Sequence, residues 1–189
     1  MTNAIVADLP AIVFMKVGTH AGESFEQIME RKNREFQDTG RIFWGYGGGT
    51  MHPIQRVQPF AQMKIEQGLG LTLVMQSIIS RHPPTEAHAI EYSSDGIHWE
   101  PIPKGIRVQG SRYALVLDEI KPSDLSINLA DYRVGIGPSA GKIASQYIQG
   151  RVDKGCLEHI QPGTSEVEPK IITVGPFARL QPPYAVVLR

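Results

Sequence analysis

Cysteine is almost absent from this chain of 189 residues, in which Cys156 is the single example. A single cysteine excludes an intramolecular disulfide and a cluster of cysteine ligands around zinc. Such a composition is typical of a reducing compartment, and a chain of this length can bury a hydrophobic core without cross-links. We therefore expect a cytoplasmic protein.

The chain also lacks an excess of either charge, with 19 Lys and Arg against 19 Asp and Glu. Proteins that bind nucleic acid nonspecifically usually carry a basic excess, because they release counterions from the phosphate backbone. Balanced charge therefore disfavours nucleic acid as the partner, although a local basic patch would still allow it.

Long apolar runs are missing as well. The apolar runs are too short to span a bilayer. Residues 1–18 lack the basic start and apolar core of a signal peptide. These absences predict a soluble protein with no membrane partner.

Hydrophobic patterning predicts more strands than helices. Short β-branched runs bounded by glycine or polar residues are typical of strands. The expected strands cover residues 11–17, 41–46, 71–79, 112–120, 132–137, 171–175 and 184–188, with a hairpin inside 87–103. Residues 47–58 are expected to form an extended loop and 150–170 an irregular segment.

Three helices are expected, each from its capping residues. Ser24 with Gln27 forms a capping box for a helix over 24–38, which turns Lys32 mainly toward solvent. A second helix covers 59–67, and Ser139 caps a third over about 140–149.

These elements indicate an α+β fold in a single domain over 1–189, with the irregular segment packed on it. Strict alternation of strand and helix is absent, so a doubly wound sheet is not expected. We predict a curved, mostly antiparallel sheet or a small β-barrel with about three helices. The order of strand, helix, strand, loop and short helix followed by β-structure resembles the PUA-like barrels, which include modified-base and RNA readers.

The segment FWGYGGGTMHP, residues 43–53, is the first candidate for ligand binding. Trp44 and Tyr46 share one face of a strand, since side chains alternate across it. Glycines bring the backbone close to a ligand, and two aromatic rings beside them could stack on a planar group such as a nucleobase. The candidate site residues here are Trp44, Tyr46, Gly47, Gly48, Gly49, Thr50 and His52. A tight bend beside two core aromatics would explain the same pattern.

The second candidate is VGIGPSAGKIAS, residues 134–145. Three residues rather than four separate Gly137 from Gly141, so the segment does not match a phosphate-binding P-loop. Ser139, Gly141 and Lys142 at the start of a helix would nevertheless favour an anion. An ordinary capped helix is the alternative. Arg133, Arg151 and Lys154 could contribute further positive charge.

No catalytic residues, metal ligands or cofactor are predicted. The histidines show no paired spacing for a metal, and no nucleophile elbow occurs. Cys156 is better explained as a small buried residue than as a nucleophile. The turn YSSDGIHW, residues 92–99, resembles one found in some β-sandwich sugar-binding modules, although a hairpin with a packed Trp99 explains it equally well.

Together, the two glycine segments predict non-catalytic binding, by sensing or sequestration, of a nucleotide or another small phosphate-bearing ligand. Two other hypotheses stay open. One is a PUA-like reader of nucleic acid or a modified base, and the other is a phosphoester or nucleotide hydrolase that uses histidine as acid and base. A homodimer is compatible with a β-rich domain that has exposed edges.

Overall fold

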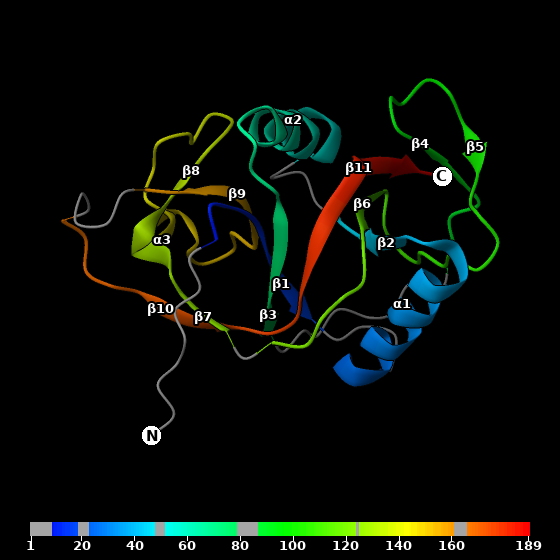
Figure 1. Cartoon of the computed structure of the whole chain (residues 1–189), viewed down its shortest axis with the longest axis horizontal. Helices are drawn as coiled ribbons and strands as arrows, with labels where there is room; N and C mark the ends of the chain where they lie inside the picture. The colour runs from blue at the N-terminus through cyan, green and yellow to red at the C-terminus, as the bar shows by residue number, and fades with distance from the viewer. Residues whose placement is uncertain (1–8, 19–22, 48–51, 79–86, 124, 161–165) are drawn as a thin grey trace.

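The computed structural model describes residues 9–18, 23–47, 52–78, 87–123, 125–160 and 166–189. It is an α+β fold in which strands dominate (Figure 1). The strands are β1 (Ala11–Gly18), β2 (Ile42–Gly45), β3 (Thr72–Ile78), β4 (Glu91–Ser93), β5 (Glu100–Pro101), β6 (Tyr113–Leu117), β7 (Leu125–Asn128), β8 (Tyr132–Val134), β9 (Lys154–His159), β10 (Ile171–Val174) and β11 (Phe177–Leu188). The helices are α1 (Phe25–Thr39), η1 (Pro53–Val57), α2 (Gln58–Glu66), η2 (Leu129–Asp131) and α3 (Ala144–Tyr147).

The described strands form a mixed sheet of nine strands and a second sheet of two. The path of the large sheet is β2-β6-β11-β3-β1-β9-β8, with β4 and β5 attached to β11. Strands β1 and β3 are parallel, and the other pairings of described strands are antiparallel. The expectation of a mostly antiparallel sheet is confirmed. The sheet does not close, because β2 and β8 form its two ends among the described strands.

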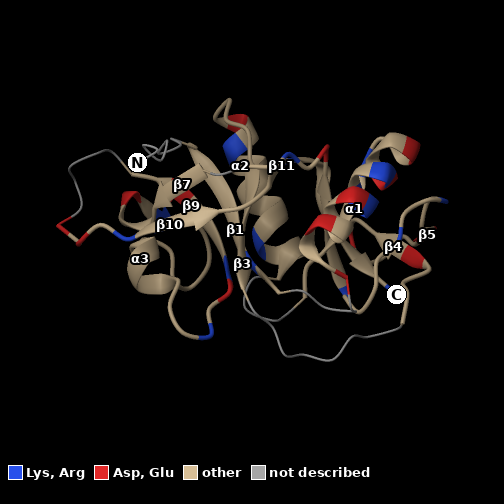
Figure 2. Cartoon of the chain, turned by 90° about the horizontal axis from the view of Figure 1, so that it is seen from below, with Lys and Arg blue, Asp and Glu red and all other residues tan. Residues whose placement is uncertain are grey.

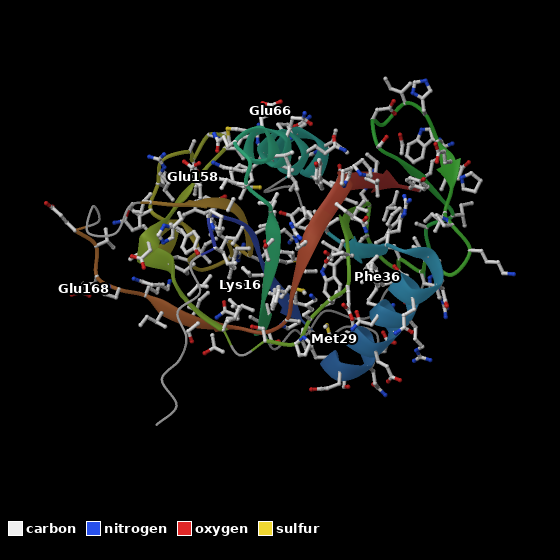
Figure 3. All side chains as sticks on the ribbon, in the orientation of Figure 1. Lys16, Met29, Phe36, Glu66, Glu158 and Glu168 are labelled. Atoms are coloured by element: carbon white, nitrogen blue, oxygen red, sulfur yellow. The ribbon has the colours of Figure 1, made fainter. Side chains whose placement is uncertain are left out.

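Helix α1 forms where the capping residues predicted it. The Ser24 side chain accepts from the Gln27 N–H, the Gln27 side chain accepts from the Ser24 N–H, and Gly40 ends the helix in the left-handed conformation. Met29 and Phe36 point from α1 toward the sheet and pack on its core (Figure 3). Acidic and basic side chains are interspersed along this helix (Figure 2).

Lys32 is buried, which corrects the expectation that it faces solvent. Its ammonium group donates to Glu35 Oε2 at 2.9 Å and to the Phe43 carbonyl at 2.6 Å. Glu35 Oε1 accepts from the Phe43 N–H at 2.9 Å. The pair therefore satisfies both backbone groups of Phe43 on the side of β2 that faces away from β6, where no described strand pairs.

Residues 53–57 are helical, which corrects the extended loop expected over 47–58. The Gln58 N–H donates to the Pro53 carbonyl across five residues, so η1 is a π-helix that leads directly into α2. Pro53 lies in the first turn of η1 and Pro59 in the first turn of α2. Proline is tolerated at these positions because the first turn of a helix leaves its N–H groups without helical acceptors.

The segment over 150–170 is not simply irregular, because it contains strand β9. This strand inserts between β1 and β8, where Cys156 pairs with Val13 and Leu157 with Val134. Sequence patterning missed β9 because only Cys156 and Leu157 in KGCLEH are clearly apolar. Within the described residues, no helix is both long and apolar enough to cross a bilayer.

Candidate functional site

Trp44 and Tyr46 share a face, as predicted, but that face is the core. Trp44 is 5% exposed and Tyr46 is 0% exposed, and both belong to the main hydrophobic cluster. The expectation of an accessible stacking platform is therefore wrong for these two rings. The reason is that this face of β2 contributes to the main hydrophobic cluster together with side chains from α1, α2 and β11.

The Tyr46 hydroxyl is a polar group that is buried in this core. It has no hydrogen-bond partner in the described part of the chain, and burial raises the pKa of Tyr46 well above its usual value, with further contributions from Cys156 and Asp153. The Lys154 ammonium lies 5.5 Å from the centre of the Tyr46 ring and donates to Asp153 Oδ2 at 2.6 Å. Since buried polar groups in proteins are nearly always paired, this hydroxyl indicates a place for a water or ligand atom.

His52 lies beside the same segment. Its Nε2 is 2.9 Å from the Tyr113 hydroxyl, and the two rings meet edge to face with centroids 4.6 Å apart. The Tyr46 N–H donates to the Tyr113 carbonyl at 2.8 Å, so Tyr113 connects the two predicted site residues. The Nδ1 atom of His52 is buried and has no partner within the ranges that the structure describes.

The glycines of the first segment are only partly described. Gly48, Gly49 and Thr50 lie outside the described residues. A methyl group on Gly47 would meet no atom within 4 Å, so packing does not explain that glycine. Gly45 is different, because a Cβ there would lie 2.7 Å from Ser111 Oγ.

The second segment forms a turn rather than a long capped helix. The Gly141 N–H donates to the Val134 carbonyl and the Val134 N–H to the Lys142 carbonyl, each at 2.8 Å. These bonds hold the backbone in a hairpin, so α3 begins only at Ala144, after Ile143. Ser139 does not cap it, and the predicted anion site at a helix N-terminus is wrong. Gly141 and Lys142 are exposed in the turn.

The second segment packs against η1 through Arg56. Helix η1 begins at Pro53, the last residue of the first segment. A Cβ on Gly137, which has a φ of 89°, would lie 3.1 Å from Arg56 Nε. A Cβ on Gly135 would lie 2.4 Å from the Phe60 ring of α2. Glycine at both positions lets the turn pack closely on η1 and α2.

Arg56 is half-buried and has no carboxylate within ion-pair distance among the described residues. Its guanidinium donates only a long bond of 3.5 Å to the Gln55 carbonyl. Arg133, by contrast, has its charge matched by Glu158 at 2.7 Å. Sequence reasoning missed Arg56, because nothing in PIQRV distinguishes it from a solvent-exposed arginine.

Cys156 is fully buried, and burial raises the pKa of its thiol to about 12, against a smaller opposing effect of Arg56. A thiol with such a pKa stays protonated at neutral pH, which argues against a nucleophile. In the described part of the chain, no group of three or more His, Cys, Asp or Glu side chains is placed to hold a metal ion.

No family model, curated protein or solved structure matches this chain.

Proposed function

We propose that the chain binds a nucleotide or nucleotide-derived ligand without changing it, as a sensor or a sequestering protein. The proposed site is centred on Arg56, where η1 packs against the 135–142 turn. In this proposal Arg56 binds a phosphate, and Ser139, Gly141 and Lys142 of the turn are further candidate contacts. Gly47 and the residues Gly48, Gly49 and Thr50, which lie outside the described part of the chain, stay candidate contacts from the sequence.

The guanidinium of Arg56 is the observation that carries this proposal. A half-buried guanidinium without a carboxylate is uncommon, since its planar fork of donors is suited to carboxylate or phosphate oxygens. Gly137 gives it room, because any side chain there would contact it. A phosphate beside Arg56 would receive the charged hydrogen bonds that the protein does not supply.

Two buried polar atoms without partners in the described part of the chain support a ligand that also has neutral hydrogen-bonding groups besides its phosphate. The Tyr46 hydroxyl and His52 Nδ1 have no partners among the described residues, and they precede and follow the glycines of the first segment in the sequence. The Trp44 and Tyr46 rings themselves belong to the main hydrophobic cluster, so they are not proposed as a stacking surface.

The PUA-like barrel is proposed as the framework of this site. The ring of Tyr46, which follows β2, lies near Lys154 at the start of β9, although β2 and β9 are distant in the order of strands. Such a contact is expected if the sheet curls toward closure. A site at the mouth of a curled sheet is a common position for small ligands.

The first prediction tests Arg56. Isothermal titration calorimetry against mono-, di- and cyclic nucleotides is expected to identify a ligand with saturable binding. Arg56→Gln is expected to weaken it about tenfold to a hundredfold, which corresponds to the roughly 1.5–3 kcal/mol of a charged hydrogen bond. Arg34→Gln, on the exposed face of α1, is the matched control and keeps the native affinity.

The absence of binding across the panel would refute the proposal, and so would equal affinities of the Arg56 and Arg34 variants. Chromatography of the bound ligand after long incubation separates sequestration from catalysis. An intact ligand agrees with the proposal, whereas a hydrolysed one supports the hydrolase hypothesis.

A further inference from the structure

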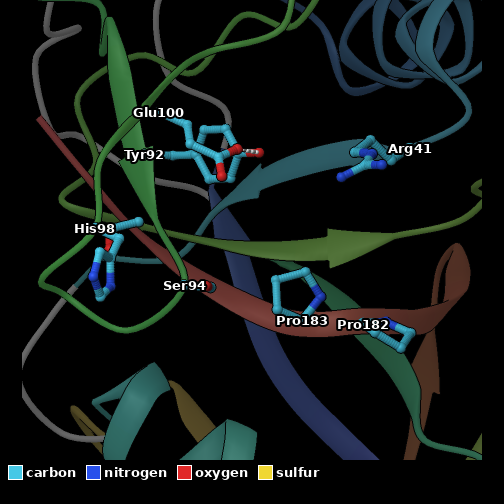
Figure 4. A pocket seen from close by; sticks show the side chains of 8 residues that line it. Arg41, Tyr92, Ser94, His98, Glu100, Pro182 and Pro183 are labelled. Atoms are coloured by element: carbon cyan, nitrogen blue, oxygen red, sulfur yellow. Dashed lines mark hydrogen bonds between the residues drawn. The ribbon is translucent and has the colours of Figure 1, made fainter.

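A cleft of about 380 Å³, which Arg56 does not line, lies between the β4–β5 hairpin, the start of β2 and a bulge in β11 (Figure 4). Arg41 lies on one side and the Tyr92–Glu100 pair on the other, while Pro182 and Pro183 line the floor. The pairing of β11 with β6 shifts register between Leu180 and Ala185, and the two prolines lie in the bulge that results.

Hydrogen bonds from two glutamine side chains connect the walls of the cleft. The Gln58 amide, at the start of α2, donates to the Ser94 carbonyl at 2.9 Å and to the Ala185 carbonyl at 2.7 Å. The Gln181 amide donates to the Leu117 carbonyl at 2.7 Å and to the Gly40 carbonyl at 3.2 Å, next to Arg41. The hairpin turn, the bulge and the residue before Arg41 are thereby held in place without any ligand.

Arg41 has no partner in this cleft. It is half-buried, and among the described residues its guanidinium makes no hydrogen bond or ion pair, although it lies close enough to lower the pKa of Tyr92 slightly against larger opposing effects. The nearby carboxylate of Glu100 accepts from the Tyr92 hydroxyl at 2.7 Å instead. The donors of Arg41 are thus left for an acceptor from outside the protein.

The far wall carries two carboxylates, those of Asp95 and Glu100. His98 Nδ1 is 2.6 Å from Asp95 Oδ2, and that bond raises the pKa of His98 while it lowers the pKa of Asp95. The Asp95 carboxylate lies against the His98 ring, and Glu100 places a second carboxylate on the same side. A second anionic group of a ligand would be repelled there, so one anionic group at Arg41 fits best.

We propose that this cleft binds a small organic oxyanion, with its single carboxylate or phosphate on Arg41 and its carbon skeleton over Pro182 and Pro183. The flat apolar faces of the two prolines suit a ring or a short hydrocarbon. The volume of about 380 Å³ lies at the low end for small-molecule sites, which suits a small ligand.

The second prediction tests the cleft by NMR titration with three probes that share one ring: benzoate, phenyl phosphate and neutral benzamide. Benzoate or phenyl phosphate is expected to give saturable shifts of the Arg41 Nε–H and His98 ring signals, and benzamide is not. Whichever anion binds more tightly identifies the head group. Arg41→Gln is expected to weaken binding about tenfold or more, because a charged hydrogen bond is lost.

Arg41→Lys keeps the charge without the planar fork and is expected to bind with intermediate affinity, which excludes misfolding as the cause. Arg56→Gln should bind the probes normally, so this test is independent of the first site. The proposal is overturned if neither anion shifts these signals, if benzamide binds equally well, or if Arg41→Gln retains the native affinity.

Discussion

The buried hydroxyl of Tyr46 shows how one residue can couple stability to binding. A hydroxyl that leaves water without a new hydrogen bond costs about 1–3 kcal/mol of folding free energy. Tyr46 carries this cost at 0% exposure, whereas Tyr132, which is 1% exposed, hydrogen-bonds with both backbone groups of Leu9 at 3.1 and 3.3 Å. The two tyrosines therefore form a matched pair.

The third prediction uses this pair. Tyr46→Phe is expected to keep or raise the melting temperature of the free protein, because the unpaired hydroxyl is removed and the ring stays packed. The same variant should gain less stability from the nucleotide identified above. Tyr132→Phe is the control, with an expected loss of about 1 kcal/mol from its broken hydrogen bond. A loss as large in Tyr46→Phe as in Tyr132→Phe, measured by urea unfolding, would contradict the argument.

At the scale of elements, the Lys32–Glu35 ion pair makes backbone hydrogen bonds to β2 of the kind that a neighbouring strand would make. Lys32 and Glu35 of α1 satisfy the N–H and the carbonyl of Phe43, and they also bond the Arg107 carbonyl at 2.8 Å and the Arg107 N–H at 3.2 Å. The pair thus connects α1, β2 and the segment before β6. It also blocks an edge that could otherwise pair with another chain.

The fourth prediction follows from these backbone contacts. Lys32→Met or Glu35→Leu alone is expected to cost about 3–5 kcal/mol, because one buried charge loses its partner. Replacing both charged residues of a buried pair by apolar ones often leaves stability unchanged. Here the N–H and carbonyl groups of Phe43 and Arg107 would also lose their hydrogen-bond partners. We expect the double variant to stay at least about 2 kcal/mol less stable than the native chain.

Urea unfolding measures these differences. The exposed pair Glu30–Arg34 on the same helix, with 3.7 Å between its charged atoms, is the control, and its loss should cost less than about 1 kcal/mol. A double variant as stable as the native chain would show that the pair acts only through its charges.

At the scale of the whole molecule, balanced charge separates the proposed ligand binder from a nucleic-acid reader. Positive side chains such as Arg31, Lys64 and Arg133 are matched by carboxylates within ion-pair distance. Arg41 and Arg56 are half-buried arginines without such a partner among the described residues. Arg41 lines the cleft beside β4 and β5, whereas Arg56 packs against the turn at Gly137. Isolated charges suit small anions better than a long phosphate backbone.

The fifth prediction compares the affinities of a single nucleotide and a short nucleic-acid strand. The nucleotide that binds best and a ten-residue single strand of the same base are expected to bind with similar affinity at 50 mM salt. A reader that contacts many phosphates would prefer the strand strongly and lose that preference steeply with salt. Such a preference, measured by fluorescence anisotropy at 50 and 200 mM salt, would favour the alternative hypothesis.

The sequence alone determined features set by neighbouring residues. Ser24, Gln27 and Gly40 specify the ends of α1 because capping bonds span only a few positions, and the apolar run at 11–17 specifies β1. The shared face of Trp44 and Tyr46 follows from the alternation of a strand. The tertiary structure decided that this face is buried, since exposure depends on what packs against β2.

Features that join distant residues were also decided only by the tertiary structure. The packing of Arg56 on Gly137 and the burial of Lys32 against Phe43 depend on the curl and register of the sheet. Strand β9 forms because β1 and β8 offer it two edges, and α3 is short because Val134 pairs with Gly141 and Lys142. Contacts between segments this far apart in the chain leave no local pattern, because the free energy that forms them comes from packing and not from sequence neighbours.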